Sequence, residues 1–506
     1  MLSKVHAAAL RGVEASPVEV EVHVGPGEER IIVVGLPDAA VRESVDRVST
    51  ALTSSGYHLP PGKTTINLAP ADLRKEGPSF DLAIALAWLT ASEQASTERA
   101  ELYALAGELA LTGQIRRIKG VLPIALTARA EGRRGLLVPV DNAPEAAVVE
   151  GLEVIPVKTL REAVEFLAGT SPLLPVRVDT QSLFSKAQAN GGDLQEVKGQ
   201  ETVKRALEIA AAGGHNLILI GPPGTGKSML AKRLGGILPP LTLNEALETT
   251  RIHSVAGLLE PHQALVTQRP FRAPHHTASN AGLLGGNINP SPGEISLSHH
   301  GVLFLDELPE FRRSVLETMR QPLEEGHVTI SRAAGKMTFP SEFMLVAAMN
   351  PTPDGKMPSE SRSSPREIQN YLGRISGPLL DRIDLHVEVP PVKFREMNAQ
   401  AGGESSVVIR ERVIAARDIQ QRRWHGAPAC NARMQPRDLQ RHCTLDEPAR
   451  LLLRSAMEEL DLSARAYDRI LKVARTIADL AHSEKLTAAH VSEAIQYRSL
   501  DRQIWT

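Results

Sequence analysis

The spacing of apolar residues predicts a mixed α/β region in the first third of the chain. Short stretches typical of strands occur at residues 18–24, 27–36, 63–70, 135–142 and 153–160. Helical spacing follows the second of these and ends at Gly56, and a continuous apolar stretch from Phe80 predicts a buried helix. Residues 101–131 predict a strand pair and a further helix. These patterns indicate an α/β domain at residues 1–168.

The rest of the chain divides after a segment with a different composition. Residues 169–194 are rich in Pro, Ser, Gln and Gly, which predicts a linker or a loosely packed crossing segment. Residues 195–395 mix helical and strand-like stretches and predict a second α/β domain. Residues 396–506 predict a helical domain. Its candidate helices lie at residues 407–426, 446–460, 463–483 and 487–500.

Composition narrows the class of protein without naming a function. A chain of 506 residues is long enough for about three domains. Its 57 basic and 59 acidic residues give a net charge of −2, so any nucleic-acid contact would be confined to a loop or channel. Cys430 and Cys443 are too few for a disulfide framework or a metal cluster, which fits a reducing compartment. The longest apolar run, Leu82–Leu89, is too short to span a membrane, and the N-terminus lacks the apolar core of a signal peptide. We therefore expect a cytoplasmic protein with no membrane partner.

The clearest chemical motif lies between a strand-like run and a helix. The apolar residues 216–220 lead into the loop Gly221-Pro222-Pro223-Gly224-Thr225-Gly226-Lys227-Ser228 and then into helical spacing. This is the pattern G-x-x-x-x-G-K-[ST] in the context of strand, loop and helix that it requires. Backbone N–H groups of such a loop surround phosphate oxygens, and the positive end of the helix dipole assists them. Lys227 would contact the outer phosphates and Ser228 would offer its hydroxyl to Mg²⁺, so we expect ATP and Mg²⁺ as ligands.

A second, acidic motif indicates ATP hydrolysis. The segment GVLFLDELPE at residues 301–310 places an apolar run before Asp306 and Glu307. A buried strand would deliver both carboxylates at its end. We expect Asp306 to hold Mg²⁺, directly or through water. Glu307 is placed to polarise the attacking water.

These motifs resemble those of AAA+ ATPases, and the resemblance implies roles for further residues. Asn350 ends a strand-like run where AAA+ proteins keep a polar sensor, and the pair Gly199-Gln200 resembles part of the nucleotide-base pocket. Arg382 fits an arginine finger, which reaches the nucleotide of the neighbouring subunit. Arg465 fits the sensor arginine of the helical lid. A finger that acts between subunits needs a closed head-to-tail ring.

Two features have more than one interpretation. Residues 327–340 alternate as a hairpin whose tip is flanked by Arg332 and Lys336. The hairpin is either solvated or a pore element whose basic tip neutralises DNA phosphates. Paired histidines at 275–276 and 299–300 lie on a glycine-rich span. Because adjacent residues on an extended chain point to opposite faces, we interpret them as hydrogen-bonding loop residues rather than metal ligands.

The first domain resembles the proteolytic domain of Lon proteases. The resemblance is carried by EGPSFDLAIAL at residues 76–86 and LTGQIRRIKGVLPIALTARAEGRRGLLVPVDN at residues 111–142. That family uses a Ser–Lys dyad, and its serine falls on Ser79. Ile124 stands about where the lysine should be, and Lys119 precedes that helix. A serine hydroxyl without a base is a poor nucleophile. We therefore expect a non-proteolytic Lon-like α/β domain in which Ser79 is a turn or helix-cap residue.

Over almost the entire chain the sequence resembles the bacterial ComM/YifB family of magnesium-chelatase-like AAA+ proteins. RPFRAPHHT, PGEISLSHHGVLFLDELPEF and SGPLLDRIDLHVEVP carry this resemblance. It implies a homo-hexameric ATPase that promotes branch migration on DNA during natural transformation. Relatives often carry cysteine pairs with zinc-ligand spacing after the sensor asparagine. The corresponding stretches here, 350–355 and 361–365, hold no cysteine, so we expect no zinc.

Alternative functions remain open at this point. A metal-insertion motor like the magnesium chelatase ATPase would share the AAA+ branch, but as a rule lacks a Lon-like domain. A peptidase would need the absent lysine. An ATP-binding scaffold without turnover disagrees with the presence of Lys227, Asp306, Glu307 and Arg382. The favoured hypothesis is a DNA translocase that moves along a strand as ATP hydrolysis proceeds around a ring.

Overall fold

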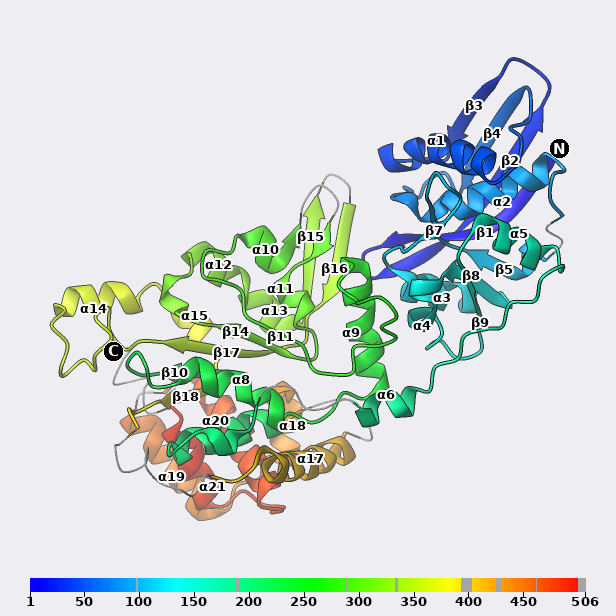
Figure 1. Ribbon diagram of the computed structural model, residues 1–506. Helices are drawn as coiled ribbons and strands as arrows, with labels where there is room; N and C mark the ends of the chain where they lie inside the picture. Colours follow the sequence, from blue (N-terminus) through cyan, green and yellow to red (C-terminus); the bar gives the residue numbers. More distant parts are fainter. Residues whose placement is uncertain are drawn as a thin grey trace.

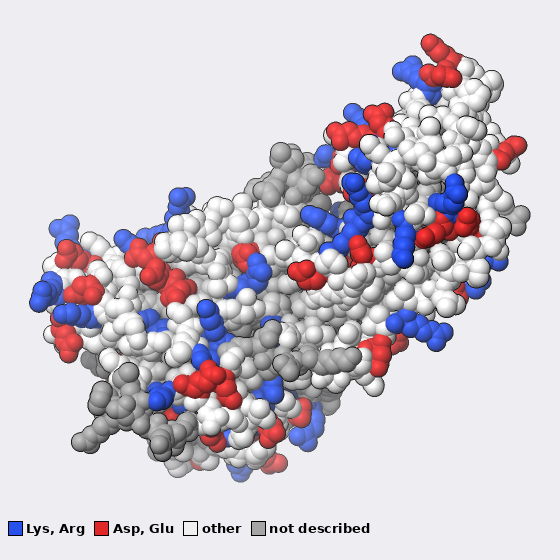
Figure 2. Space-filling view, in the orientation of Figure 1, with Lys and Arg blue, Asp and Glu red and all other residues white. Residues whose placement is uncertain are grey.

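The computed structural model has three parts, for which we use the predicted boundaries as labels. The front domain (residues 1–168) projects from one end, and the helical domain (396–506) packs beneath the core domain (195–395) (Figure 1). Basic and acidic side chains are interspersed over much of the drawn face (Figure 2). None of the described helices is long and apolar enough to cross a membrane. The structure describes residues 1–96, 99–186, 192–286, 290–332, 335–392, 403–424, 430–460 and 462–498.

The front domain is built on a seven-stranded mixed sheet in the order β3-β4-β2-β1-β5-β8-β9. The strands are β1 Leu2–Arg11, β2 Glu14–Gly25, β3 Arg30–Val34, β4 Lys63–Ala69, β5 Tyr103–Leu105, β8 Gly135–Pro139 and β9 Glu153–Val157. A small pair beside the sheet comprises β6 Glu108–Leu109 and β7 Ile115–Arg116. The helices are α1 Ala39–Ser54, α2 Asp81–Ala91, α3 Val121–Ala130, α4 Ala143–Ala146 and α5 Leu160–Leu167.

Alternation along the central strands produces two separate hydrophobic layers in this domain. Ala7 and Ala9 of β1 face the layer that holds α1, α2 and α5. Ala8 faces the layer that holds α3 and α4. This period of two is that of a strand with both faces covered. The predicted α/β class is confirmed, although β1 itself was not predicted.

The core domain is a parallel five-stranded sheet in the order β11-β14-β17-β10-β18. Its strands are β10 Leu217–Ile220, β11 Phe271–Arg272, β14 Val302–Leu305, β17 Met344–Met349 and β18 Leu385–Glu388. Because the strands are parallel, the carboxyl ends of β10, β14 and β17 meet at one edge. The phosphate loop, the acidic motif and Asn350 follow these three ends, so the topology brings them together.

Helices cover both faces of the core sheet. One face packs against α7 Glu201–Gly213, α8 Lys227–Ile237 and the helical domain. The other helices of the core are α9 Leu243–Ala256, α10 Asn280–Leu284, α11 Glu294–Leu297, α12 Arg313–Thr318, α13 Arg320–Glu325, α14 Pro365–Leu372 and α15 Gly377–Leu380. Two antiparallel strand pairs lie on this side, the mostly buried pair β12 Gly285–Gly286 with β13 Ser291–Pro292, and the projecting hairpin β15 His327–Arg332 with β16 Gly335–Pro340 (Figure 1). The single helix expected at residues 312–326 is two helices, because Pro322 has no N–H for the carbonyl of Thr318.

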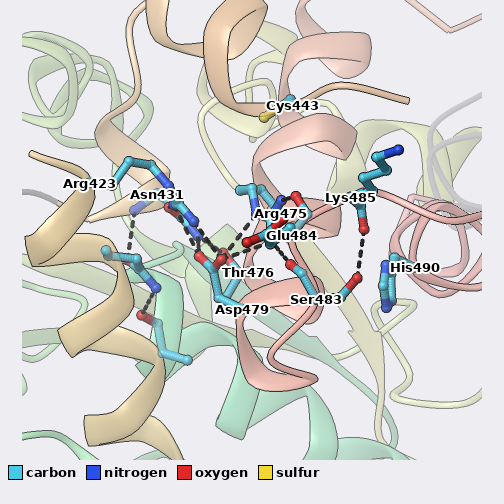
Figure 3. Close-up of polar contacts among 12 residues, drawn as sticks. Arg423, Asn431, Cys443, Arg475, Thr476, Asp479, Ser483, Glu484, Lys485 and His490 are labelled. Atoms are coloured by element: carbon cyan, nitrogen blue, oxygen red, sulfur yellow. Dashed lines mark hydrogen bonds and ion pairs between the residues drawn. The ribbon is translucent and has the colours of Figure 1, made fainter. Parts of the chain in front are cut away.

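The helical domain surrounds a buried carboxylate, that of Asp479 (Figure 3). It accepts hydrogen bonds from Arg423 Nη2 at 2.6 Å, Asn431 Nδ2 at 2.8 Å and Arg475 Nε at 3.0 Å. Arg475 also donates to the carbonyl of Glu484 at 2.6 Å. The described helices are α17 Ser406–Arg423, α18 Pro436–His442, α19 Glu447–Glu459, α20 Ala464–Leu480 and α21 Ala488–Gln496. The predicted linker contains α6 Thr180–Lys186.

Replacing Asp479 with alanine should strongly destabilise the helical domain. The change leaves the guanidinium groups of Arg423 and Arg475 largely buried without their carboxylate, which typically costs about 3–5 kcal/mol. The measurement is the denaturant midpoint of the unfolding transition, followed by circular dichroism. Asp418→Ala, an exposed aspartate on α17, is the matched control and should shift the midpoint little. Equal midpoints for the two variants would contradict the central role of Asp479.

The front domain is docked on helix α9 of the core. The Ser254 hydroxyl on α9 donates to the carboxylate of Glu145, and the N–H of Gly120 donates to the Ser254 carbonyl at 3.1 Å. Burial is the main cause that raises the pKa of Glu145. His262 Nε2 lies 3.4 Å from Asp141 Oδ1 at the edge of the same contact. The two domains therefore share buried polar contacts and are not joined by the chain alone.

Candidate functional site

The phosphate loop holds its lysine in a preformed position. Nζ of Lys227 donates to the carbonyls of Gly221 at 2.6 Å and Pro222 at 2.8 Å, and to Oδ1 of Asn350 at 3.2 Å. Burial lowers the pKa of Lys227, and the carboxylate of Asp306 acts in the opposite direction. The predicted sensor residue Asn350 is therefore in direct contact with the phosphate-loop lysine.

The oxygen donors expected to hold Mg²⁺ lie together. Oγ of Ser228 donates to Oδ2 of Asp306 at 2.6 Å, and the N–H of Glu307 donates to Oδ1 of the same carboxylate at 2.9 Å. Hydroxyl and carboxylate oxygens are the ligands that Mg²⁺ prefers. The cavity beside them has a volume of about 360 Å³. Its lining includes Pro223, Gly224, Gly226, Lys227, Ser228, Asp306, Glu307 and Asn350. The residues present therefore fit a magnesium-bound nucleotide phosphate.

Glu307 has a partner that the sequence did not reveal. Its φ is 52°, in the left-handed region that non-glycine residues rarely adopt. Its Oε2 lies 3.4 Å from Nδ1 of His276. The His276 ring packs edge-on against Phe311, with 6.4 Å between the ring centroids. The paired histidines were the only signal in the sequence, and they did not indicate which of the two would meet the acidic motif. His276 is placed to fix the direction in which the Glu307 carboxylate points.

Replacing His276 with alanine should lower turnover more than it changes the KM for ATP. Exposed ion pairs contribute about 0.2–1 kcal/mol, and the Glu307 side chain of this pair is 58% exposed. One tenfold step in rate corresponds to 1.36 kcal/mol, so we expect a decrease in kcat of about two- to fivefold. Steady-state ATP hydrolysis measures it. His275→Ala is the matched control, since Nδ1 of His275 meets Thr277 instead. Equal kcat values for the two variants would exclude a role for His276 at Glu307.

Gln200 forms hydrogen bonds with the backbone of the phosphate loop. Its Nε2 donates to the carbonyls of Thr225 and Pro390, both at 3.0 Å. The amide therefore joins the phosphate loop to the segment after β18. Its proposed contact with the nucleotide base stays a prediction.

The two predicted arginines lie at the other edge of the core sheet. The carbonyl of Arg382 accepts from Asn216 Nδ2 at 2.9 Å, which places Arg382 at the amino end of β10. Its guanidinium donates to Glu324 and to the carbonyl of Pro378. Arg465 is close by, with Nη1 3.4 Å from Oδ2 of Asp381. Since β10 has 4 residues, its two ends lie roughly 10 Å apart. Neither arginine therefore meets Lys227 of its own chain.

The hairpin β15–β16 is present as predicted, with Lys336 exposed on β16. The side chain of Arg332 lies outside the described structure. The contact of these residues with DNA stays a prediction.

The second histidine pair forms a cluster with Glu248. Nε2 of His300 lies 2.7 Å, and Nε2 of His299 3.4 Å, from Oε2 of Glu248, a spacing that could hold a metal ion. However, Nδ1 of His299 accepts the N–H of Glu342 at 2.9 Å. In a neutral imidazole the proton then sits on Nε2, which faces Glu248 and cannot bind a metal. His300 Nε2 forms a hydrogen bond with Glu248, and the interpretation of these histidines as hydrogen-bonding residues rather than metal ligands stays a prediction.

A single carboxylate organises the stretch that follows Asn350. Asp354 accepts hydrogen bonds from Thr352 Oγ1 at 2.7 Å, Ser361 Oγ at 2.8 Å and the N–H of Arg362 at 2.9 Å. These bonds hold its pKa well below the usual range. The loop after Asn350 is closed by this carboxylate, and Gly355 packs against Pro223 of the phosphate loop.

The front domain has no preformed Ser–Lys dyad among its described residues. Ser79 lies in a short 3₁₀ turn at Pro78–Phe80, and no lysine amine of the described chain bonds its hydroxyl. Ile124 is fully buried in α3. Lys75 is buried too, but its amine donates to the carbonyl of Pro70. The geometry agrees with the non-proteolytic interpretation.

Comparisons with known proteins cover almost the whole chain. Family models match residues 20–142 (subunit ChlI of Mg-chelatase), 193–397 (magnesium chelatase, subunit ChlI) and 403–498 (magnesium chelatase, subunit ChlI C-terminal). The protein YifB of Salmonella typhimurium is 46% identical over 505 residues, which are 99% of this chain and 98% of YifB. The competence protein ComM of Haemophilus influenzae has the same identity and coverage. Lon protease 2 of Bacillus subtilis is 28% identical over 130 residues, which are 26% of this chain and 23% of that protease. The chain therefore belongs to the ComM/YifB family of magnesium-chelatase-like AAA+ ATPases.

Proposed function

We propose that this protein is a ring-shaped motor, a homo-hexamer, that couples ATP hydrolysis to movement on DNA. Its task would be to promote branch migration of recombination intermediates during natural transformation. The observation that carries the proposal is the position of Arg382 and Arg465 at the sheet edge away from Lys227 of the same chain. A nucleotide site supplied with these arginines needs a second copy of the chain, and a head-to-tail ring supplies one at every interface.

Within such a site, each residue of this chain has a defined task. Lys227 and the loop N–H groups bind the outer phosphates, Glu307 orients the attacking water, and Asn350 holds Lys227 in place. Ser228 and Asp306 would hold Mg²⁺, which when bound neutralises phosphate charge. The DNA substrate is supported by the likeness to the competence protein ComM and by the exposed Lys336 on a projecting hairpin.

A second candidate is a motor that acts on a protein partner in metal insertion or remodelling. It is favoured by the family models, whose descriptions name a magnesium chelatase subunit. One of these models matches residues 20–142, which lie in the front domain. The presence of the front domain is therefore not an argument against this candidate.

ATP hydrolysis measured with and without single-stranded and branched DNA separates the two candidates. Lys227→Ala serves as the blank, because it removes the positively charged amine that is expected to contact the outer phosphates. Strong stimulation by branched DNA, together with movement of the branch point, is the expected result. A rate of ATP hydrolysis that is the same with and without each DNA would reject the translocase and favour the motor that acts on a protein partner.

A further inference from the structure

We propose that the front domain and the hairpin β15–β16 form one continuous surface that binds nucleic-acid phosphates, with Arg11 and Lys119 as the front-domain contacts. We call it the junction surface, defined by Arg11, Lys119 and Lys336. The proposal rests on the proposed DNA function and assigns part of the binding site to the front domain.

The turn between β1 and β2 is packed against the hairpin. Val13 of this turn is buried in the same hydrophobic cluster as Val328 of β15 and Phe339 of β16. A Cβ added at the neighbouring Gly12 would lie 3.9 Å from the carbonyl oxygen of Thr338, which is ordinary van der Waals contact. The front domain therefore reaches the element that carries Lys336, and the two cannot be treated as separate surfaces.

Further contacts lead from this turn to Lys119. Gly120 lies so close to Leu10 of β1 that a Cβ there would meet Leu10 Cδ1 at 2.4 Å. A Cβ at Gly257, just after α9, would meet Cε of Lys119 at 2.6 Å. The Lys119 side chain thus lies across the joint between the domains. Arg11 follows Leu10 and Lys119 precedes Gly120 in the chain, so both cations flank the contacts that join the front domain to the hairpin and to α9.

The charges beside these contacts are available to a ligand. Arg11, Lys119 and Lys336 are exposed, and within the described chain no ion pair engages any of them. Glu14 lies opposite Arg11 in the β1–β2 register but makes no ion pair with it. Residues 115–134 contain six basic residues and one acidic residue, although two of the six, Arg116 and Arg134, form ion pairs. Lys and Arg side chains gather where the front domain meets the core (Figure 2).

A polyanion with regularly spaced charges fits this arrangement better than a small anion. Exposed, unpaired cationic side chains neutralise the phosphates of a nucleic-acid backbone, and the counterions released from the nucleic acid favour binding. Such contacts do not depend on the base sequence. Nucleic acid is the favoured polyanion because the junction surface includes a projecting hairpin. An acidic polypeptide is the competing ligand that the experiment must separate.

The test compares three double variants of the full-length protein. Arg11→Gln with Lys119→Gln removes both charges, and Arg11→Lys with Lys119→Arg keeps them. Arg437→Gln with Arg441→Gln is the matched control, because both are exposed arginines without an ion pair, on α18 of the described helical domain. Binding of a fluorescent single-stranded oligonucleotide is measured by anisotropy over a series of salt concentrations. Melting curves check the fold, and exposed, unpaired side chains should alter them little.

We expect the charge-removing variant to bind at least tenfold more weakly at low salt. Its plot of log affinity against log salt should be shallower by about 0.7 for each phosphate that the variant no longer neutralises. The charge-keeping variant and the control should follow the wild type. A charge-removing variant with wild-type affinity and slope would overturn the inference while leaving the DNA function intact. So would weaker binding to polyglutamate with unchanged binding to DNA. Wild-type protein that binds no DNA would instead reject the proposed function itself, and this inference with it.

Discussion

Replacing Arg382 with alanine should reduce ATP turnover by about 10³-fold or more, and the loss should appear at the site of the neighbouring subunit. A finger arginine stabilises the charge that develops on the transferred phosphoryl group, and such residues contribute about 10³–10⁵ in kcat. Equilibrium binding of ATP should survive, because Lys227 and the phosphate loop of each chain are unchanged. Steady-state hydrolysis and nucleotide binding by calorimetry measure the two effects.

A mixing experiment decides which subunit Arg382 serves. Arg382→Ala protein and Glu307→Gln protein should each be inactive alone. In mixed rings, some interfaces pair an intact Glu307 with an intact Arg382 from the next subunit, about a quarter of them in an equal mixture. Turnover should therefore recover on mixing. An arginine that acted on its own nucleotide would give no recovery.

Arg320→Ala is the matched control for Arg382→Ala. Arg320 lines the same cavity as Arg382, is 41% exposed, and pairs with Glu317 at 2.9 Å. Because this pair is partly exposed, its removal should change stability and turnover only slightly. Loss of turnover in both variants would indicate disruption of the cavity rather than the removal of a finger.

The sequence was sufficient to predict which parts of the nucleotide site meet, because parallel strands bring their carboxyl ends to one edge. Lys227, Asp306 and Asn350 each follow such a strand, and their contacts depend on topology more than on local detail. The position of Arg382 follows from the same topology, because residues that precede a parallel strand lie at the opposite, amino edge of the sheet. It precedes β18, so a parallel sheet places it at the amino edge, away from its own nucleotide.

The features that escaped prediction depend on contacts between distant segments. The alanines of β1 are compatible with helix and strand, and only pairing with β2 selects the strand. His276 meets Glu307 because the loop before α10 returns to the acidic motif and because Glu307 adopts a left-handed φ. The docking of Val13 into the core domain has no signal in sequence spacing either. The periodicity of hydrophobic residues predicts single helices and strands, but it does not indicate which of them pack together.

Replacing Glu307 with glutamine should abolish most hydrolysis while ATP remains bound. The amide has nearly the same shape as the carboxylate, but it cannot accept a proton from the attacking water, and a positioned base typically contributes about 10²–10⁴-fold. Single-turnover hydrolysis, compared with equilibrium binding of ATP, measures the effect. Glu310→Gln is the matched control, since Glu310 is three residues away and pairs with Arg374 at 3.0 Å outside the cavity lining. Turnover within about threefold of wild type in Glu307→Gln would mean that another group orients the water.

The same variant tests whether His276 acts through Glu307. If His276 only directs the carboxylate, then adding His276→Ala to Glu307→Gln should cause no further decrease in kcat, although His276→Ala alone lowers it. Residues that act as a unit give such non-additive effects in a double-mutant cycle. Independent decreases that multiply would show that His276 contributes by a separate route, for example by contacting the phosphates directly. The cycle therefore distinguishes a positioning residue from a catalytic one, which the 3.4 Å separation between Nδ1 of His276 and Oε2 of Glu307 does not do alone.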